Sequence, residues 1–265
     1  MRYIVSISGG AGSAVAADRA ITRYGRHNVI LWFADTKWES ADLYRFINDC
    51  MQRWGGRLYT YTDGRTPLQV AEDRRVIPNS LIAPCAFELK IKPFRAWLWR
   101  QPKPVTVLYG LDWSEPHRIA QRRFYHRKSG KARAPVGTAR LMHGVYEDYP
   151  LLWKPLEFRP YADVVRSWGI EPPAAYAEGF SHNNCGGRCV KQGISEWRRL
   201  KAARPADFDA VAAWELAMQS TLDTTRTILK SRTNGETTPL RLIDLDPLHE
   251  FAATQDDLFS CVCGV

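Results

Sequence analysis

Ser8-Gly9-Gly10-Ala11-Gly12-Ser13 follows an apolar, β-branched run, Tyr3-Ile4-Val5-Ser6-Ile7, and precedes a segment of small residues over 14–24. This order predicts a strand, a glycine turn and a helix. Glycines let the backbone turn tightly against a ligand, and the first turn of a helix adds unpaired N–H donors at the positive end of its dipole. Ser8 and Ser13 add hydroxyl donors. The stretch therefore predicts an anion site that suits a phosphate.

Two common phosphate loops do not match this stretch. A Walker A loop needs a lysine after its glycines, and a dinucleotide loop needs G-x-G-x-x-G, whereas Gly12 is followed by Ser13-Ala14-Val15. The pattern present is S-G-G-x-x-S at the end of a strand. A glycine-rich turn between a strand and a helix can also be purely structural, so the loop alone leaves both interpretations open.

Composition limits the class of protein. The chain has 265 residues, of which 45% are hydrophobic and 25% charged, as in a globular protein with a well-buried core. We expect neither a signal peptide nor a membrane span, and we expect a cytoplasmic location, because the N-terminus already reads as a strand and no long apolar run follows. Its 37 Lys and Arg against 28 Asp and Glu give a net charge of +9, which favours polyanionic partners, although such a charge can also serve solubility alone.

Beyond the first helix, the sequence keeps alternating between strand and helix patterns. It predicts strands over 28–33, 57–61, 105–109 and 145–152, helices over 41–54, 84–99, 162–168, 195–203 and 206–230, and an edge strand over 238–243. Such alternation implies right-handed βαβ crossovers and a parallel sheet covered by helices on both faces, which is a Rossmann-like α/β fold. We expect an α/β domain over residues 1–158 and a mainly helical region over 159–265.

Polar residues follow the predicted strands. Asp35 follows the second strand, Asp112 follows the fourth, and Arg118 lies six residues further on. Ligands of parallel sheets bind at the carboxyl ends of strands, so these residues are expected near the glycine loop. Asp35 suits a ribose hydroxyl or Mg²⁺, with a helix N-cap as the alternative. Arg118 and Lys90, on the helix over 84–99, suit a phosphate, with a solvated surface position as the alternative for Lys90.

Five of the six cysteines are candidate metal ligands. Cys185 and Cys189 form C-x3-C with two glycines between them, Cys261 and Cys263 form C-x-C, and Cys85 begins a helix. Glycines between paired cysteines let both sulfurs turn toward one centre. Four thiolates suit tetrahedral Zn²⁺ or a [4Fe-4S] cluster, and spacing does not choose between them. Separate pairs of ordinary cysteines are the alternative.

Together, these motifs resemble the PP-loop (adenine nucleotide α-hydrolase-like) superfamily. The S-G-G-x-x-S loop is similar to that of ATP pyrophosphatases, tRNA thiolases and phosphoadenosine phosphosulfate (PAPS) reductases, and C-x4-K-x-x-P over 85–93 is similar to a segment of PAPS and adenylyl-sulfate reductases. H-N-N-C-G-G-R-C-V-K over 182–191 with the C-x-C resembles phage- and prophage-borne PAPS-reductase-like proteins. The chain differs from the family pattern at Gly12, where many members have Asp, at Ala86, where the reductases have a second cysteine, and at Asp112, where they have a basic residue.

The resemblance implies a Rossmann-like (HUP-type) sheet and an ATP pyrophosphatase or sulfurtransferase-like enzyme. ATP or another adenine nucleotide would bind on residues 8–13 with Mg²⁺, be cleaved between its α- and β-phosphates, and adenylate a substrate that a sulfur or amine nucleophile then attacks. Candidate catalytic residues are Ser8, Ser13, Asp35, Lys90 and Arg118, and Asp112 joins the nucleotide-binding group.

Two other functions remain open at this point. A genuine PAPS or adenylyl-sulfate reductase would need Cys261 or Cys263 in place of the missing E-C-G-[IL]-H motif. A non-enzymatic nucleic-acid-binding module would use a structural metal. The basic segment from Arg122 to Arg133, which contains Phe124 and Tyr125, suits DNA or RNA as a partner, with a solvated loop as the alternative. A homodimer is a further expected partner.

Overall fold

A five-stranded parallel sheet forms the centre of the computed structural model. The structure describes residues 2–114, 116, 118–119, 144–153, 160–233 and 235–246. The strands are β1 (Arg2–Ile7), β2 (Val29–Asp35), β3 (Arg57–Thr62), β4 (Val105–Tyr109) and β5 (Val145–Asp148). Their order is β3-β2-β1-β4-β5, so the strand order reverses between β1 and β4. This sheet confirms the predicted Rossmann-like α/β fold.

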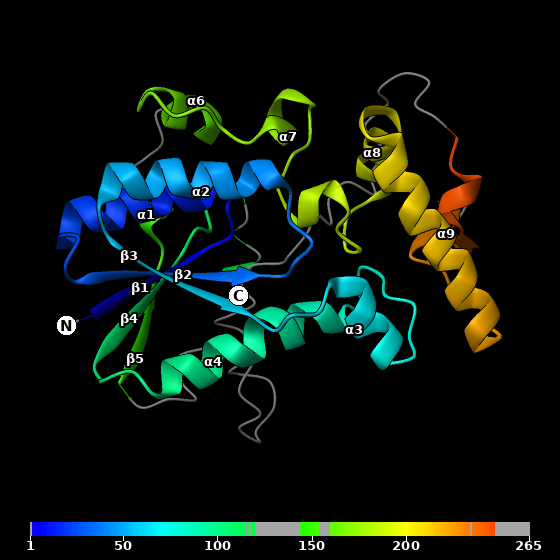
Figure 1. Cartoon of the computed structure of the whole chain (residues 1–265), viewed down its shortest axis with the longest axis horizontal. Coiled ribbons are helices and arrows are strands. Elements are labelled where there is room, and N and C mark those ends of the chain that lie inside the picture. The colour runs from blue at the N-terminus through cyan, green and yellow to red at the C-terminus, as the bar shows by residue number, and fades with distance from the viewer. Residues whose placement is uncertain are drawn as a thin grey trace.

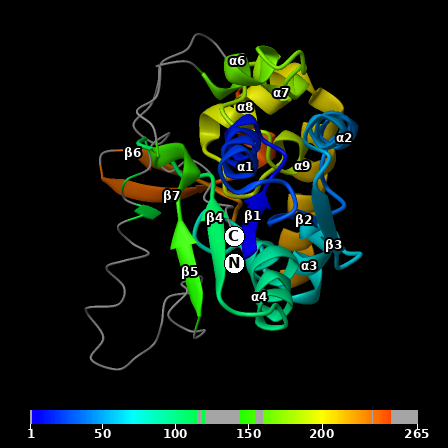
Figure 2. The same cartoon turned by 90° about the vertical axis from the view of Figure 1, so that its left-hand side faces the viewer.

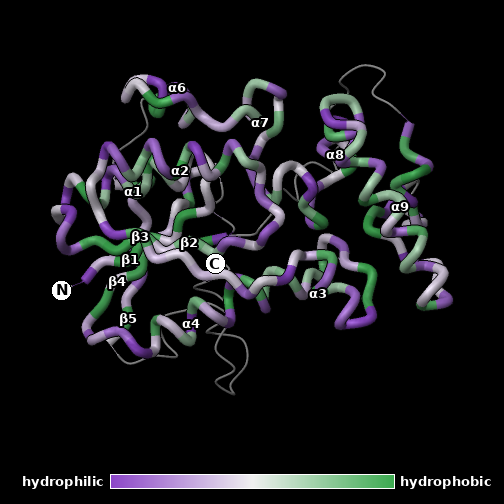
Figure 3. Tube along the Cα trace, in the orientation of Figure 1, coloured by the Kyte–Doolittle hydropathy of each residue, from purple (hydrophilic) through white to green (hydrophobic). Residues whose placement is uncertain are grey.

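Helices cover both faces of the sheet (Figure 1). On one face lie α1 (Ala11–Tyr24) and α2 (Ala41–Trp54), and on the other lie the π-helical turn η1 (Ala86–Ile91) and α4 (Lys92–Trp99). Figure 2 shows the two layers from the end of the sheet. Along β2, Leu31 and Phe33 pack toward α1 and α2, whereas Trp32 and Ala34 pack toward α4. This two-residue alternation makes both faces of β2 apolar. In Figure 3, green lies along the central strands and also in the region of α9.

The rest of the described chain lies over the layer formed by α1 and α2 or beyond the carboxyl ends of the strands (Figure 1). It comprises α3 (Pro67–Asp73), η3 (Pro150–Leu152), α6 (Tyr161–Arg166), α7 (Ala174–Ala177), η4 (Cys185–Gly187), α8 (Ile194–Ala203), α9 (Pro205–Leu222), β6 (Leu229–Thr233), β7 (Glu236–Leu240) and η5 (Leu242–Asp244). Val165 of α6 belongs to the core that α1 and α2 form. By contrast, Val70 of α3 and Leu89 of η1 belong to a second core with α8 and α9. Elements from both sides of residue 158 therefore contribute to each core, and the predicted domain boundary at this residue stays a prediction.

Most predicted elements are confirmed, including the helix over 84–99, which contains a π turn. Three predictions are wrong in part. The strand predicted over 145–152 ends at Asp148, because Pro150 has no N–H for a strand ladder. The helix predicted over 206–230 ends at Leu222, where Asp223 is left-handed, and β6 then begins at Leu229. The edge strand predicted over 238–243 is β7, which ends at Leu240.

The helix α3 was not predicted, although its N-terminus carries a recognisable signal. Thr66 accepts a hydrogen bond from the Gln69 N–H, and the Gln69 side chain accepts one from the Thr66 N–H. This capping box, followed by Pro67 in the first turn, is a standard helix start. No helix within the described residues is long and apolar enough to cross a membrane.

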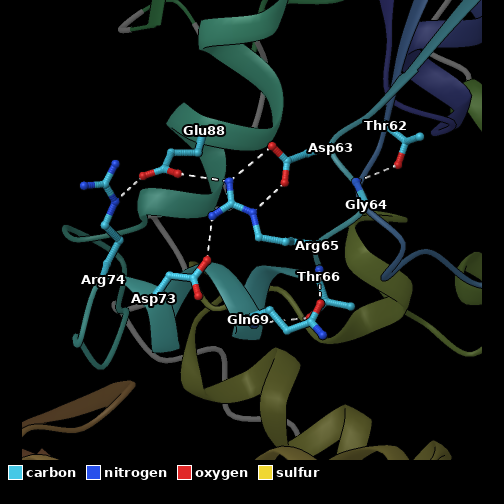
Figure 4. A network of polar contacts seen from close by, with 9 residues as sticks. All are labelled: Thr62, Asp63, Gly64, Arg65, Thr66, Gln69, Asp73, Arg74 and Glu88. Carbon is cyan, nitrogen blue, oxygen red and sulfur yellow. Dashed lines mark hydrogen bonds and ion pairs between the residues drawn. The ribbon is translucent and has the colours of Figure 1, made fainter.

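Arg65, just after β3, forms ion pairs with residues of α3 and η1 (Figure 4). Its guanidinium contacts Asp63 at 2.6 Å, Asp73 at 2.6 Å and Glu88 at 3.2 Å, and Arg74 also pairs with Glu88. Arg65 is partly exposed, so each pair contributes modestly to stability. The network fixes where η1 lies, and η1 carries Lys90.

Candidate functional site

The glycine loop lies at the carboxyl end of β1, where the strand order of the sheet reverses. Gly9 has a left-handed φ of +78°, and Gly10 is the N-cap of α1. The first N–H group bonded within the helix is that of Ala14, which donates to the Gly10 carbonyl at 3.1 Å. The N–H groups of Gly12 and Ser13 therefore belong to the helix end that offers donors to a ligand. Open α/β sheets bind their ligands at such a reversal point.

Ser13 shapes the loop from within. Its hydroxyl donates to the Gly10 carbonyl at 2.8 Å and accepts from the Ser8 N–H at 3.2 Å. The Ser8 and Ser13 hydroxyl oxygens are 3.3 Å apart. Both serines predicted as ligand donors thus lie together, and their first role is to close the loop around its own backbone.

Tyr176 of α7 closes the loop from outside. Its hydroxyl accepts a hydrogen bond from the Ala11 N–H at 2.9 Å, and burial raises the pKa of Tyr176 above its ordinary value. A Cβ added to Gly10 would lie 3.1 Å from the same hydroxyl. A side chain at position 10 would therefore force Tyr176 away.

The end of β4 approaches the loop closely. A Cβ on Gly110 would lie 3.2 Å from the Ser13 Cα, so glycine is what allows the two backbones to meet. Nearby, the ring of Tyr161 lies 3.4 Å from where a Cβ on Gly12 would be. The Tyr161 hydroxyl donates to Asp112 at 2.7 Å. The structure thus brings Asp112 to the predicted edge of the site, held by a residue that borders the loop.

Asp35 lies at the end of β2 and is 7% exposed. Its carboxylate accepts hydrogen bonds from the Lys37 ammonium at 2.8 Å, the Lys37 N–H at 2.9 Å and the Tyr44 hydroxyl at 2.7 Å. Burial alone would raise the pKa of Asp35, but the bonds from Lys37 and Tyr44 outweigh it and hold this pKa below its usual value. Asp35 is therefore ionised, and a cation already neutralises it.

Glu39, in the loop after β2, connects three segments of the edge. One carboxylate oxygen accepts from the Thr36 hydroxyl at 2.9 Å and lies 4.0 Å from the Lys90 ammonium. The other accepts from the Cys185 N–H at 2.8 Å. Lys90 is 8% exposed, so it is a buried cation at the carboxyl edge rather than a solvated surface lysine.

The segment over 181–189, which we call the cysteine knuckle, packs against the loop after β2. Cys185 and Cys189 are buried against each other and against Trp38. Arg188 stacks over the Trp38 ring at 4.2 Å and donates to the Trp38 carbonyl at 3.2 Å. Asn183, which is 2% exposed, donates to the Gly9 carbonyl at 3.2 Å. The knuckle therefore contacts both the glycine loop and the loop after β2.

The predicted metal ligands are only partly brought together. Cys185 and Cys189 are neighbours, whereas Cys85 packs in the second core with Leu89. Within the described residues, no group of three or more His, Cys, Asp or Glu could hold a metal ion. Cys261 and Cys263 lie outside the described residues. The metal site therefore stays a prediction.

Two predicted phosphate contacts are not decided by the structure. Arg118 is partly exposed beyond β4 on the carboxyl side, and its role stays a prediction. The basic segment from Arg122 to Arg133 lies outside the described residues.

Four further residues of the site were not predicted. Tyr161 and Tyr176 come from helices distant in sequence, and nothing in their local pattern indicates the loop. Glu39 and Asn183 had weak signals: Glu39 lies four residues after a predicted strand end, and Asn183 lies within the quoted cysteine motif.

The electrostatics of this edge suit an anion better than a free cation. The N-terminus of α1 supplies positive potential, while Lys90 pairs with Glu39 and Lys37 pairs with Asp35. A Mg²⁺ ion on Asp35 would have to displace the Lys37 ammonium, so the residues present do not fit the predicted magnesium contact.

Comparison with known proteins gives only distant structural likenesses. No protein-family model matches the chain, and no curated protein matches it. Among solved structures, phosphoadenylyl-sulfate (PAPS) reductase from Candida auris, in a phosphate complex, is similar to it. The sequences are 18% identical, and the alignment covers 68% of this chain and 79% of that chain with a TM-score of 0.45. So distant a likeness assigns no function, which therefore has to be inferred from the site itself.

Proposed function

We propose that this protein is an enzyme that binds ATP or another adenine nucleotide at the glycine loop and cleaves it at the α-phosphate. The observation that supports the proposal is the packing of the cysteine knuckle against both the glycine loop and Glu39, whose carboxylate pairs with the buried Lys90. A turn with a purely structural role would not need this second chain segment hydrogen-bonded to it.

Each residue has a defined task in this proposal. The N–H groups of Gly12 and Ser13 bind phosphate oxygens at the start of α1. Lys90 stabilises the negative charge that grows on the phosphate oxygens in the transition state. An oxygen of the substrate attacks the α-phosphorus, the bond to the β-phosphate breaks, and pyrophosphate leaves with the electron pair.

Mg²⁺ and the cysteine-bound metal are treated differently in this proposal. We assign no step to Mg²⁺ on Asp35, because Lys37 already neutralises that carboxylate. Cys185 and Cys189 would supply two of the four thiolates that Zn²⁺ or a [4Fe-4S] cluster needs, and Cys261 and Cys263 remain the proposed source of the others. Such a group would stabilise the knuckle or carry sulfur or electrons.

The first test is calorimetric titration of the protein with ATP. Wild type should bind, and Lys90→Met should bind at least about 10-fold more weakly because a buried charge-assisted contact is lost. Lys92→Met is the matched control, since Lys92 is exposed two residues further on and should leave the affinity unchanged. Equal losses in both variants, or no binding by wild type, would refute the nucleotide site.

The second test measures pyrophosphate release from ATP with DNA or RNA present. Gly10→Val should abolish release, because its side chain would displace Tyr176 and open the loop. Gly56→Val is the control: a Cβ on Gly56 meets no atom within 4 Å, and Gly56 lies at the opposite edge of the sheet. Full release by Gly10→Val would contradict the proposal.

PAPS reduction is the second candidate function, since the cysteine knuckle adjoins the proposed nucleotide site. It predicts sulfite formation from PAPS with thioredoxin as the reductant. Sulfite formation that is lost in Cys261→Ser or Cys263→Ser would favour this function over adenylation. For the non-enzymatic alternative, we expect nucleic-acid binding with steep salt dependence and no ATP affinity.

A further inference from the structure

We propose that Glu39 is a positioning residue that couples the cysteine knuckle to the glycine loop, so that a change at Cys185 or Cys189 alters nucleotide binding. The inference rests on the proposed function, because it makes the knuckle one wall of the nucleotide site. It assigns a task to a carboxylate that accepts a hydrogen bond from the knuckle backbone and pairs with Lys90.

Both carboxylate oxygens of Glu39 have polar partners, although Glu39 lies in a loop. Its side chain is 2% exposed, and its two oxygens face a hydroxyl, an ammonium and a backbone N–H from three separate segments. A buried carboxylate is costly unless such partners satisfy it, and removal of Glu39 takes one partner away from Lys90 and from the Cys185 N–H.

The knuckle backbone depends on this support. Cys185 has a left-handed φ of +52°, and Gly186 and Gly187 follow at +60° and +81°. A residue with a Cβ is strained in this conformation, and surrounding contacts must hold it there. Glu39 provides one of these contacts directly at the Cys185 N–H.

The same knuckle reaches the glycine loop through Asn183. Its buried amide donates to the Gly9 carbonyl, and Gly9 is itself left-handed. Figure 1 shows the segment between α7 and α8 passing the carboxyl end of β2. A continuous path of hydrogen bonds and backbone therefore runs from Lys90 through Glu39, Cys185 and Asn183 to Gly9.

Hydrogen exchange of the ligand-free protein tests the coupling directly. Glu39→Ala should raise the exchange rates of the amides over 185–188 and over 9–13 about 10-fold, because the charge-assisted hydrogen bond that holds Cys185 is lost and the knuckle in turn supports Gly9 through Asn183. If Glu39→Ala does not fold, Glu39→Gln gives the same test, since it keeps one acceptor oxygen and removes the charge that faces Lys90. Unchanged exchange in both segments would overturn the proposal.

Glu215→Gln is the matched control. Glu215 is also a buried glutamate that accepts two backbone N–H groups, from Ile228 and Leu242 at 2.7 Å each, but it lies in the second core. It should lower global stability without changing exchange over 185–188 or 9–13. If Glu215→Gln accelerates both segments as much as the Glu39 variant does, the effect is general destabilisation and the proposal is wrong.

A second arm separates this inference from the proposed function. With ATP added to wild type, exchange over both 9–13 and 185–188 should slow, and Glu39→Gln should weaken ATP binding about 10-fold while Glu215→Gln leaves it unchanged. Slowing over 9–13 alone would overturn the coupling and leave the nucleotide site standing. Absence of any ATP effect would overturn the proposed function, and the ligand-free exchange would then decide the coupling by itself.

Discussion

Glu39 and Glu215 join distant segments in the same way, but their surroundings differ. Glu215 lies within α9, is fully buried, and accepts two backbone N–H groups in an apolar core. Glu39 lies in a loop at the carboxyl edge of the sheet and faces a buried lysine as well as a backbone N–H.

The difference extends to the backbone around each glutamate. Close to Glu39, the non-glycine residues Lys37 and Cys185 have left-handed φ values of 56° and 52°. Glu215 binds the N–H groups of Ile228, which directly precedes β6, and of Leu242, which begins η5. Strained residues persist where surrounding contacts over-determine them, and they concentrate at functional sites. The comparison teaches that Glu39 is surrounded by left-handed residues and a buried lysine, whereas the two N–H groups that Glu215 binds come from residues without left-handed φ values.

The largest effect should come from Gly9→Ala. Gly9 has a φ of +78°, and a Cβ there would lie 2.6 Å from the buried Leu43 side chain. Strain and overpacking together should lower the free energy of unfolding by about 3 kcal/mol, and ATP binding should be lost. Urea unfolding followed by titration with ATP measures both.

Gly56→Ala controls for the general effect of adding a methyl group. Its Cβ would meet nothing within 4 Å and its φ is not left-handed, so stability should stay within about 0.5 kcal/mol of wild type. If Gly56→Ala lowers the free energy of unfolding as much as Gly9→Ala does, then strain and overpacking at Gly9 are not the cause of the loss.

A smaller effect is expected at Cys185. Because its φ is left-handed, Cys185→Gly should be more stable than Cys185→Ala by about 1 kcal/mol, which is the reverse of the usual order. Cys189 serves as the control, because its φ is not left-handed and alanine should be the better replacement there. Thermal unfolding of the four variants decides this, and the usual order at both positions would refute strain at Cys185.

The smallest effect should be a pair of opposite pH dependences. Burial raises the pKa of Asp35, but the hydrogen bonds from Lys37 and Tyr44 outweigh it, and the folded-state pKa is lowered. Its stabilisation is therefore present above the ordinary pKa of about 3.9 and lost as pH falls through the folded-state value. Burial raises the pKa of Glu215 above its ordinary value, so its stabilisation is complete below about pH 4.3 and lost as pH rises through the folded-state value.

Urea unfolding between pH 3 and 7 compares wild type with Asp35→Asn and Glu215→Gln. The advantage of wild type over Asp35→Asn should shrink toward low pH, whereas its advantage over Glu215→Gln should shrink toward neutral pH. If both differences change in the same direction with pH, the contrast between the two carboxylates is wrong.

Local sequence determined much of the fold. The apolar strand patterns at β1, β2 and β4 and the glycines after β1 are sufficient to predict a parallel sheet with a loop at its carboxyl edge. They succeed because burial on both faces requires continuous apolar strands, and a tight turn into a helix requires glycine. Asp35 could be assigned to this edge because parallel strands end together, whereas Lys90 was predicted from its place on the helix over 84–99.

Only the tertiary structure decided how this edge is held. Tyr176 and Asn183 reach the glycine loop from more than 160 residues away in the chain, and the Glu39 contact with Cys185 spans 146 residues. No local pattern encodes such pairings, because they depend on how α7 and the knuckle fold back over the sheet. Sequence by itself therefore determined the position of the proposed ligand site. Long-range hydrogen bonds between segments decided which side chains surround that site.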